Sequence, residues 1–193
     1  MMDSASAYEA RAHEFLRGRD KSPIGTHIVD QWSRTLRRGA TVIELACGGG
    51  YPITRVLSSA GLQLWAVDSS PTLVAKFQSR FPVIPVQCAR VQESDFFDRT
   101  YEGAIAIGLI FLLPESEQFT LISRVSEVLV PGGRFLFMAP VERGDWIDTN
   151  TGLECRSLGQ ASYEEYLRGA GFRVVATFTD EGANNYYDVE RSR

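Results

Sequence analysis

The chain has 193 residues, of which 44% are apolar and 23% charged, as expected of one globular α/β domain with a real hydrophobic core. The net charge of −4 argues against a nucleic-acid partner and against an anionic membrane surface. The three cysteines show no C-x-x-C spacing, which argues against a disulfide framework or a cysteine metal site and favours a reducing, cytoplasmic compartment.

Residues 1–38 precede the first predicted strand. Their pattern predicts two leading helices, at 5–17 and 24–38, and the polar start of the chain lacks the apolar core of a signal peptide. No run in the chain reaches the ~18 apolar residues of a membrane span. His13 and His27 both lie in these helices, where we expect a solvated or capping role sooner than that of a base.

Short apolar runs, many of them β-branched, alternate with helical stretches from residue 41 onward. Such runs predict buried parallel strands, and the alternation predicts helices on both faces of one sheet with right-handed crossovers. The predicted strands span 41–46, 62–67, 83–87, 103–108 and 134–139, and the predicted helices span 52–59, 71–80, 114–129 and 162–170.

The end of the chain carries two further strand-like runs, at 172–179 and 185–190. The loop Asp180–Asn184 between them is short enough for a β-hairpin. We therefore expect a mostly parallel sheet of seven strands that finishes in an antiparallel hairpin. Tyr186 and Tyr187 alternate across the last strand, so we expect one of them to be buried.

These elements together predict a Rossmann-like, doubly wound α/β fold. Its expected organisation is a single domain over residues 1–193. Residues 39–193 form the core of this domain, and the helices within 1–38 are a candidate lid over a binding site.

A glycine loop closes the first predicted strand. Gly48, Gly49 and Gly50 let the backbone approach a ligand closely, and the helix that follows offers free N–H groups suited to a carboxylate or phosphate. Asp68 ends the second strand roughly 20 residues further on, where it can accept hydrogen bonds from a ribose diol. A tight turn or a helix cap explains either feature alone, whereas the two together favour a nucleoside-bearing ligand.

Two features bear on the choice between a dinucleotide and another adenosine cofactor. The dinucleotide fingerprint G-x-G-x-x-G needs a third glycine, and Ile53 stands in that position. Glu44 lies inside the preceding strand, where its carboxylate can meet a cationic amino group. This pattern favours a cofactor that carries an amino acid over one that carries a pyrophosphate.

Four stretches of the sequence resemble the motifs of a known family. Val42-Ile-Glu-Leu-Ala-Cys-Gly-Gly-Gly50 resembles the first motif of the class I S-adenosylmethionine-dependent methyltransferases, and Trp65-Ala-Val-Asp-Ser-Ser70 resembles their second. The stretch 95–106 is similar to the approach to their fourth strand, and 129–137 to their Pro-Gly-Gly turn and fifth strand. The resemblance covers about residues 38–191, and the first motif and the turn are fairly specific together.

The resemblance implies S-adenosylmethionine as the cofactor and assigns residues to it by position. The leading helices cover the cofactor in many members of this family, which adds residues from that part of the chain. The implied residues are Glu44, Ala46, Gly48 and Gly50 at the methionine part; Asp68 and Ser69 at the ribose; Arg90 and Val91 at the adenine; Ile107 and Gly108 on the methionine and acceptor side; and Tyr8 and Arg19 in the candidate lid.

The chain departs from the family pattern at two positions. Ala46 stands where the family usually has its first glycine, and Arg90 where an aspartate commonly receives the adenine amino group. A guanidinium only donates hydrogen bonds, so it cannot replace that aspartate. Adenine would then depend on backbone groups, on stacking, or on another acceptor such as Glu93.

Methyl transfer from a sulfonium requires alignment in a dry site and needs a base only for a weak nucleophile, so no fixed catalytic residue is assigned. No metal site is expected, because no cluster of ligating residues is visible. Asp145, Trp146 and Asp148, in a predicted loop at 141–148, either contact the acceptor or are ordinary surface residues.

The expected function is transfer of a methyl group to an acceptor that is a small molecule, since no separate target-recognition domain or basic stripe is visible. Neither the methylated atom nor the oligomeric state follows from the sequence. Two alternatives stay open: an NAD-type Rossmann oxidoreductase, and a non-catalytic module that binds S-adenosylmethionine.

Overall fold

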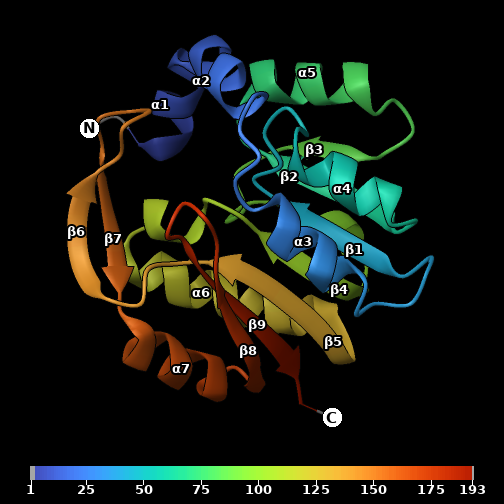
Figure 1. Ribbon diagram of the computed structural model, residues 1–193, viewed down its shortest axis with the longest axis vertical. Helices are drawn as coiled ribbons and strands as arrows, with labels where there is room; N and C mark the ends of the chain where they lie inside the picture. The colour runs from blue at the N-terminus through green and yellow to red at the C-terminus, as the bar shows by residue number, and fades with distance from the viewer. Residues whose placement is uncertain (1–2, 193) are drawn as a thin grey trace.

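The computed structural model describes residues 3–192 and contains the expected seven-stranded sheet (Figure 1). The first five strands along the chain pair in parallel, and the last two are antiparallel. In spatial order the strands are β3 (Val86–Cys88), β2 (Gln63–Asp68), β1 (Thr41–Leu45), β4 (Tyr101–Ala106), β5 (Leu129–Met138), β9 (Asn185–Arg191) and β8 (Phe172–Thr179). This topology confirms the predicted fold class.

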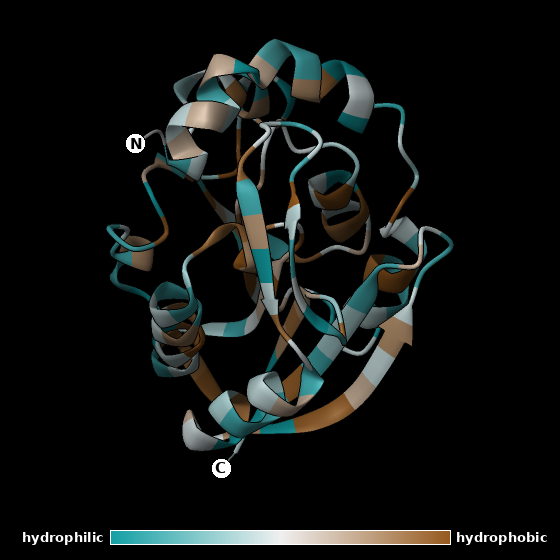
Figure 2. Ribbon diagram, turned by 90° about the vertical axis from the view of Figure 1, so that its left-hand side faces the viewer, coloured by the Kyte–Doolittle hydropathy of each residue, from teal (hydrophilic) through white to brown (hydrophobic). Residues whose placement is uncertain are grey.

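Helices cover both faces of the sheet. One core cluster joins the sheet to the helices at residues 115–128 and 160–169, and two further clusters join its opposite face to the helices at residues 26–33, 53–59 and 71–80. Figure 2 shows brown and teal bands alternating along the outer helices, as expected of helices with one buried face. The first face carries α6 (Glu115–Val128) and α7 (Gln160–Gly169), and the second carries α3 (Thr26–Ser33), α4 (Ile53–Ser59) and α5 (Pro71–Arg80).

The alternation of side chains along β1 explains this layering. Ile43 and Leu45 belong to the core on the side of α6 and α7, whereas Val42 belongs to the core on the side of α3 and α4. Glu44 shares the face of Val42 because side chains two positions apart in a strand point the same way. The strand thus directs a carboxyl group into the layer beneath α4.

The leading segment differs from the prediction of one helix at 5–17. It forms two helices, α1 (Ser4–Ala10) and α2 (Ala12–Arg19), separated at Arg11, whose φ and ψ of −116° and 15° are not helical. Both helices lie beside α5, beyond the carboxyl ends of the parallel strands (Figure 1). Ala7 of α1 and Ala12 of α2 are the buried residues of the two helices.

Several strand boundaries also differ. β3 is shorter than predicted because it begins only after Pro85, whose missing N–H weakens pairing. The predicted strand at 103–108 ends at Ala106 in β4, so Ile107 and Gly108 lie in the loop beyond it. β5 begins at Leu129, directly after α6, and its pairing with β4 shifts register across the Pro-Gly-Gly turn.

The predicted loop at 141–148 is wrong in part, because it contains strand β6 (Arg143–Ile147). This strand pairs antiparallel with β7 (Glu154–Leu158), and the two form a separate small sheet. Figure 1 shows this sheet at the side of the molecule, reaching up to the N-terminal helices. Two 3₁₀ turns, η1 (Phe96–Asp98) and η2 (Ile110–Leu112), complete the described chain.

Tyr186 and Tyr187 are both buried, whereas the prediction expected one. Their strand β9 lies between β5 and β8, with core clusters on both faces, so neither side of it meets solvent. Tyr187 stacks on Phe137 with ring centroids 4.9 Å apart.

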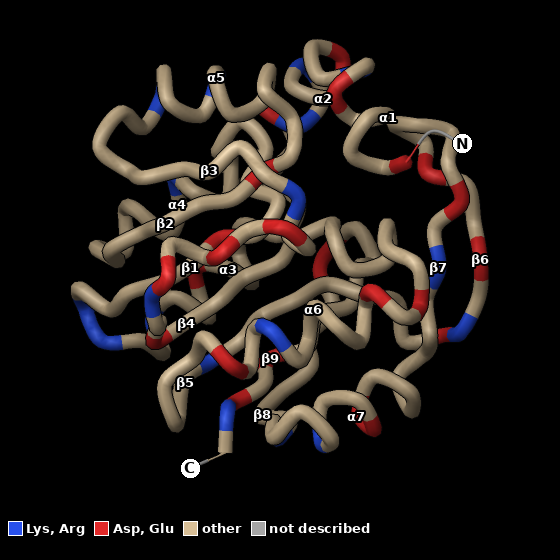
Figure 3. The backbone as a smooth tube through the Cα atoms, turned by 180° about the vertical axis from the view of Figure 1, so that it is seen from behind, with Lys and Arg blue, Asp and Glu red and all other residues tan. Residues whose placement is uncertain are grey.

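Within residues 3–192, no helix has both the length and the apolar character that a membrane crossing requires. Acidic and basic residues are interspersed along the described backbone, in keeping with the modest net charge (Figure 3).

Candidate functional site

The loops after β1, β2 and β4 converge at the carboxyl edge of the sheet, where open α/β folds bind their ligands. A cavity of about 480 Å³ lies there. Its floor includes Ala46 and Gly48 after β1, Asp68 after β2, and Ile107 and Gly108 after β4.

The leading helices form a second wall of this cavity, since Tyr8 of α1 and Phe15 and Arg19 of α2 line it. Tyr8 and Phe15 contact each other edge to face, with centroids 5.3 Å apart. The structure therefore brings the predicted lid residues Tyr8 and Arg19 to the same cavity as the glycine loop.

Asp68 is held firmly in place. The backbone N–H of Gly48 donates to its Oδ2 at 2.8 Å, and the N–H of Ser70 donates to its Oδ1 at 2.9 Å. Burial raises the pKa of Asp68, and these hydrogen bonds oppose the rise. A carboxylate can accept further hydrogen bonds, so Asp68 can still receive donors from a ligand in the cavity that it lines together with Ser69.

Glu44 lies at the base of the site and is only 4% exposed. The Thr54 hydroxyl of α4 donates to its Oε2 at 2.6 Å. Burial raises the pKa of Glu44 to about 8, against the opposing effects of this hydrogen bond and of the Arg19 charge. Glu44 lines a smaller cavity of about 40 Å³ that shares Arg19, Ala46 and Gly48 with the main one.

Arg19 places a guanidinium at the wall of both cavities. Its Nη1 donates to the carbonyl oxygen of Ile24 at 3.2 Å. Burial lowers the pKa of Arg19, whereas the neighbouring Tyr186, Glu44 and Asp180 raise it. A carboxyl group and a guanidinium that share one cavity wall suit a ligand that carries both an ammonium and a carboxylate, as a free amino acid does.

Residues 46–50 form the glycine loop, and they differ in what they contact. Ala46, in the position of the family's first glycine, has a φ of +57° and lines the main cavity. Gly50 is not among the residues that line the cavities described here. A Cβ on Gly50 would lie 2.4 Å from Phe81, so this glycine permits packing of the loop against the end of α5, and its expected place around the ligand stays a prediction.

Gly49 has a role that the sequence did not indicate. A Cβ there would lie 2.4 Å from the Cδ2 atom of Leu16 on α2, so a larger residue would require the Leu16 side chain to shift. Phe15, four residues before Arg19, is a lining residue that the prediction missed, although its helical spacing from Arg19 could have revealed it.

Arg90 and Val91 line a small cavity of about 50 Å³ that also contacts Asp68 and Ser69. The Arg90 guanidinium forms an ion pair with Asp3, at the start of α1, so its charge is already partnered. Glu93, the alternative acceptor considered for adenine, is exposed and lies outside the residues lining this cavity.

The opposite end of the main cavity is lined by the small sheet and η2. Trp146 and Asp148 line it, and the Trp146 ring lies 5.3 Å from that of Phe111 in η2. The side chain of Asp145 is exposed and forms an ion pair with Arg156 at 2.6 Å instead. Two of the three candidate acceptor residues therefore face the cavity, and one does not.

Tyr8 belongs to this end as well. The Asn150 Nδ2 lies 3.5 Å from the Tyr8 hydroxyl, at the limit of a hydrogen bond. Burial raises the pKa of Tyr8, with a further contribution from the Asp148 charge, so the hydroxyl stays protonated at neutral pH. The structure thus places Tyr8 toward the small sheet, as well as beside Phe15.

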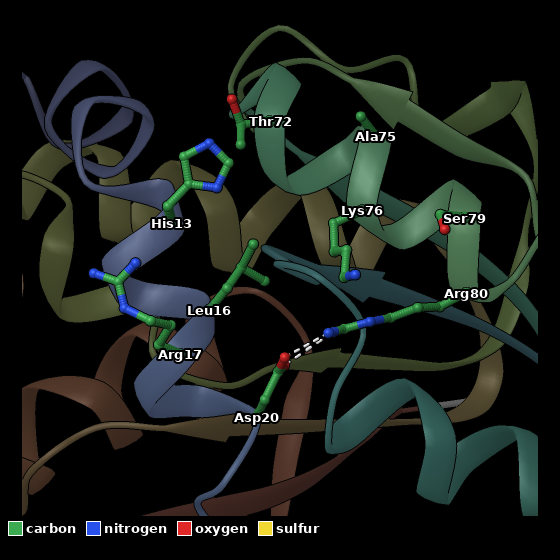
Figure 4. A pocket seen from close by; sticks show the side chains of 9 residues that line it. All are labelled: His13, Leu16, Arg17, Asp20, Thr72, Ala75, Lys76, Ser79 and Arg80. Carbon is green, nitrogen blue, oxygen red and sulfur yellow. Dashed lines mark hydrogen bonds and ion pairs between the residues drawn. The ribbon is translucent and has the colours of Figure 1, made fainter.

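A second, larger cavity of about 680 Å³ opens on the surface between α2 and α5 (Figure 4). The ion pair between Arg80 and Asp20, 2.5 Å apart, crosses it, and His13 and Lys76 lie on its walls. His13 therefore faces this outer cavity and His27 is exposed on α3. Within residues 3–192, no group of three or more His, Cys, Asp or Glu side chains could hold a metal ion.

Comparisons with known proteins point to one family. Residues 42–133 match the family model described as a methyltransferase domain. The structure resembles 1,6-didemethyltoxoflavin-N1-methyltransferase of Burkholderia thailandensis, with a TM-score of 0.78 and 20% identity over 98% of this chain and 89% of that one. It also resembles an amino pentose methyltransferase of Micromonospora echinaspora, with a TM-score of 0.73 and 14% identity over 93% and 96% of the two chains.

Two curated proteins match part of this chain in sequence. A tRNA U34 carboxymethyltransferase of Idiomarina loihiensis is 21% identical over 55% of this chain and 35% of its own length. A carboxy-S-adenosyl-L-methionine synthase of Shewanella amazonensis is 27% identical over 63% of this chain and 52% of its own length. The matches therefore span about a third to a half of these relatives.

Proposed function

We propose that this chain, which belongs to the class I S-adenosylmethionine-dependent methyltransferases, transfers a methyl group from S-adenosylmethionine to a small-molecule acceptor. The family follows from the methyltransferase domain at residues 42–133 together with the seven-stranded topology. The observation that carries the proposal is that Arg19 lines both the cavity that Asp68 lines and the adjoining cavity that Glu44 lines, because the cofactor joins an amino acid to a ribose.

The residues would divide the cofactor between them. Asp68 would accept hydrogen bonds from the ribose hydroxyls, with Ser69 beside it. Glu44 would receive the ammonium of the methionine part, and Arg19 would receive its carboxylate. These roles follow from charge complementarity and from the cavities that the three ionisable groups line.

The adenine would lie in the direction of Val91, in the small cavity after β3. Ala89 and Leu109 supply apolar contacts there. Arg90 would serve this end by holding Asp3, and so the start of α1, over the cavity rather than by contacting the base. The family's aspartate contact is then replaced by backbone groups and packing.

When bound, the cofactor supplies an electrophilic methyl group on a sulfonium. The chain's part is to align the acceptor with that methyl and to exclude water. Tyr8 and Phe15 line the cavity on the side of α1 and α2, and Ile107 and Gly108 line it on the side of the loop after β4. Because its hydroxyl stays protonated, Tyr8 would donate a hydrogen bond to the acceptor rather than act as a base.

The acceptor end favours a flat, small ligand. Phe111, Trp146 and Tyr8 contribute aromatic surface there, and aromatic rings pack well against such walls. The cavity of about 480 Å³ must take part of the cofactor as well, which limits the size of the acceptor. The similar Burkholderia enzyme was crystallised with a heterocycle of this kind, 1,6-didemethyltoxoflavin.

We also propose that residues 1–193 act as one methyltransferase domain, in which residues 1–38 supply the lid and 39–193 the core. The cavity walls contributed by α1 and α2 support this division. The three cysteines are free thiols, which suits work in the reducing cytoplasm.

The proposal is tested by turnover. The protein is incubated with S-adenosylmethionine and a panel of small aromatic and heterocyclic amines, phenols and thiols, and S-adenosylhomocysteine is quantified by mass spectrometry. Product that depends on a particular acceptor supports the methyltransferase. Cofactor binding without product for any acceptor would favour the non-catalytic module, and binding of NADH alone would favour the oxidoreductase.

A further inference from the structure

The Glu9 side chain connects two helices of the structure. It lies in α1, yet its carboxylate accepts hydrogen bonds at the beginning of α5. The Thr72 hydroxyl donates to Oε1 at 2.6 Å, the Thr72 backbone N–H donates to Oε2 at 3.1 Å, and the Ser70 hydroxyl also donates to Oε2. The N-terminal end of a helix favours such a negative charge.

The turn that Glu9 grips is the one that holds Asp68. Ser70 uses its hydroxyl to bind Glu9 and its backbone N–H to bind Asp68 at 2.9 Å. The same hydroxyl oxygen accepts from the N–H of Leu73 at 3.1 Å and so caps α5. Ser70 therefore connects the leading helix, the first turn of α5 and the carboxylate proposed for the ribose.

Helix α1 forms part of the wall of the main cavity. Ser4, Ala5 and Tyr8 of α1 line the main cavity, and Tyr8 is the residue next to Glu9. Two ion pairs also tie the leading segment down, Asp3 with Arg90 and Asp20 with Arg80. Glu9 differs from both because its partners belong to the turn that positions Asp68.

We propose that Glu9 is a positioning residue that latches α1 onto α5 and thereby closes the lid over the bound cofactor. The latch rests on the proposed function, since it needs the cavity to be the cofactor site. With Glu9 docked, Tyr8 covers the cavity and the Ser70 turn is fixed for Asp68. With Glu9 released, α1 can move away and the cofactor can exchange.

The lid must open for exchange, so its strength should appear in the rate at which the product cofactor leaves. We would measure the dissociation rate of S-adenosylhomocysteine by surface plasmon resonance. Hydrogen exchange of residues 4–19 would be followed in parallel, with and without S-adenosylhomocysteine. Glu9→Ala is expected to raise the dissociation rate by about tenfold and to speed exchange in 4–19, because it removes hydrogen bonds to a charged group.

Two variants serve as controls. Glu9→Gln keeps a hydrogen-bonding group of the same shape and should lie between wild type and Glu9→Ala. Glu14→Ala removes the same charge from α2, where the Glu14 side chain is 69% exposed and lies 4.0 Å from Arg11, and it should behave as wild type. The core of the fold should keep its exchange protection in all three.

Wild-type dissociation and exchange in Glu9→Ala would overturn the latch, as would an equal effect of Glu14→Ala. Failure of the proposed function is a separate outcome, because then wild type itself would not bind S-adenosylhomocysteine. Exchange of residues 4–19 in the unliganded variants would still report on the contact with α5. If Glu9→Ala does not fold, Glu9→Gln provides the comparison, and wild-type behaviour of both readouts in that variant would count against the latch.

Discussion

Glu44 is a buried carboxyl group at the base of the site. A carboxyl group that is 4% exposed favours its neutral form, which the pKa of about 8 expresses. The Thr54 hydrogen bond and the Arg19 charge both oppose the rise, yet the pKa stays at about 8, so a charged Glu44 needs a further cation. An ammonium group of the cofactor meets that need, so Glu44 is better suited to the bound state than to the free one.

Cofactor binding should therefore release a proton near neutral pH. Free Glu44 keeps its proton up to a pH of about 8, and pairing with an ammonium lowers its pKa in the complex. Affinity for S-adenosylhomocysteine should rise as the pH approaches 8, and calorimetry in buffers of different ionisation enthalpy would detect the proton. Glu44→Gln should bind more weakly and release none. Equal proton release from both proteins would rule out this role.

The same group should affect folding stability in the opposite direction. Its pKa rises from an ordinary 4.5 to about 8 on folding, so its contribution to stability is complete below pH 4.5 and is lost as the pH rises toward 8. Without ligand, Glu44→Gln should resist urea better than wild type at pH 8, with a smaller difference at pH 5. A constant difference across this range would contradict the assignment.

Ala46 adopts a backbone conformation that favours glycine. At a φ of +57° a residue with a Cβ is strained by about 1–2 kcal/mol. A change to glycine removes this strain, but it also lowers the free energy of unfolding by about 0.4–1 kcal/mol, because glycine makes the unfolded chain more flexible. Ala46→Gly should therefore stabilise the unliganded fold by about 1 kcal/mol in urea unfolding. Ala60, a helix C-cap at φ −73°, is the matched control, since Ala60→Gly should not stabilise. Stabilisation of both or of neither would refute the strain at Ala46.

At the scale of elements, the β6–β7 sheet is the part of the site that extends beyond the Rossmann-like core. It places Trp146 against Phe111 and Asp148 at the cavity wall. Asp148 also organises the turn after β6, since Thr151 Oγ1 donates to it at 2.6 Å. We infer that this small sheet selects the acceptor and leaves cofactor binding to the loops of the large sheet.

If the small sheet selects the acceptor, a change there should reduce methylation and leave cofactor affinity unchanged. Trp146→Ala should leave the dissociation constant for S-adenosylhomocysteine within about twofold of wild type, because the residue lies at the acceptor end. Methylation of any acceptor found in the panel should fall by more than tenfold, as expected on loss of an aromatic wall worth about 1.5 kcal/mol or more. Asp145→Ala, on the outer side of the same strand, should keep both properties. Parallel loss of cofactor affinity would assign Trp146 to the wrong subsite.

Strands that contain a run of apolar residues could be predicted from the sequence, and β6, which has none, could not. The run around Ile43 carries the β-branched residues Thr41, Val42 and Ile43, and residues 64–67 are apolar throughout, as is typical of central parallel strands. Strand β6, by contrast, reads Arg-Gly-Asp-Trp-Ile and is mostly exposed, so it shows no apolar run that would distinguish it from a loop. The break of the leading helix at Arg11 likewise left no signal, because neither glycine nor proline marks it.

At the scale of the whole molecule, the site is assembled from segments far apart in the chain. Motif position located Asp68 and Glu44, because each follows directly from a strand and its loop. Contacts such as Glu9 with Thr72, or Arg90 with Asp3, join residues more than sixty positions apart and depend on how α1 docks. Sequence patterns predict local geometry, whereas the docking of one helix on another depends on tertiary packing, which these patterns do not specify.

The central claim is that the cavity at the carboxyl edge binds S-adenosylmethionine through Asp68. Calorimetric titration with S-adenosylhomocysteine, for wild type and Asp68→Ala, tests it most directly, with NADH as the competing ligand. We predict binding by wild type, no response to NADH, and affinity weakened by at least about tenfold in a folded Asp68→Ala, since a hydrogen bond to a charged group is worth about 1.5–3 kcal/mol. Equal affinity of the two proteins, or tight binding of NADH alone, would contradict the account.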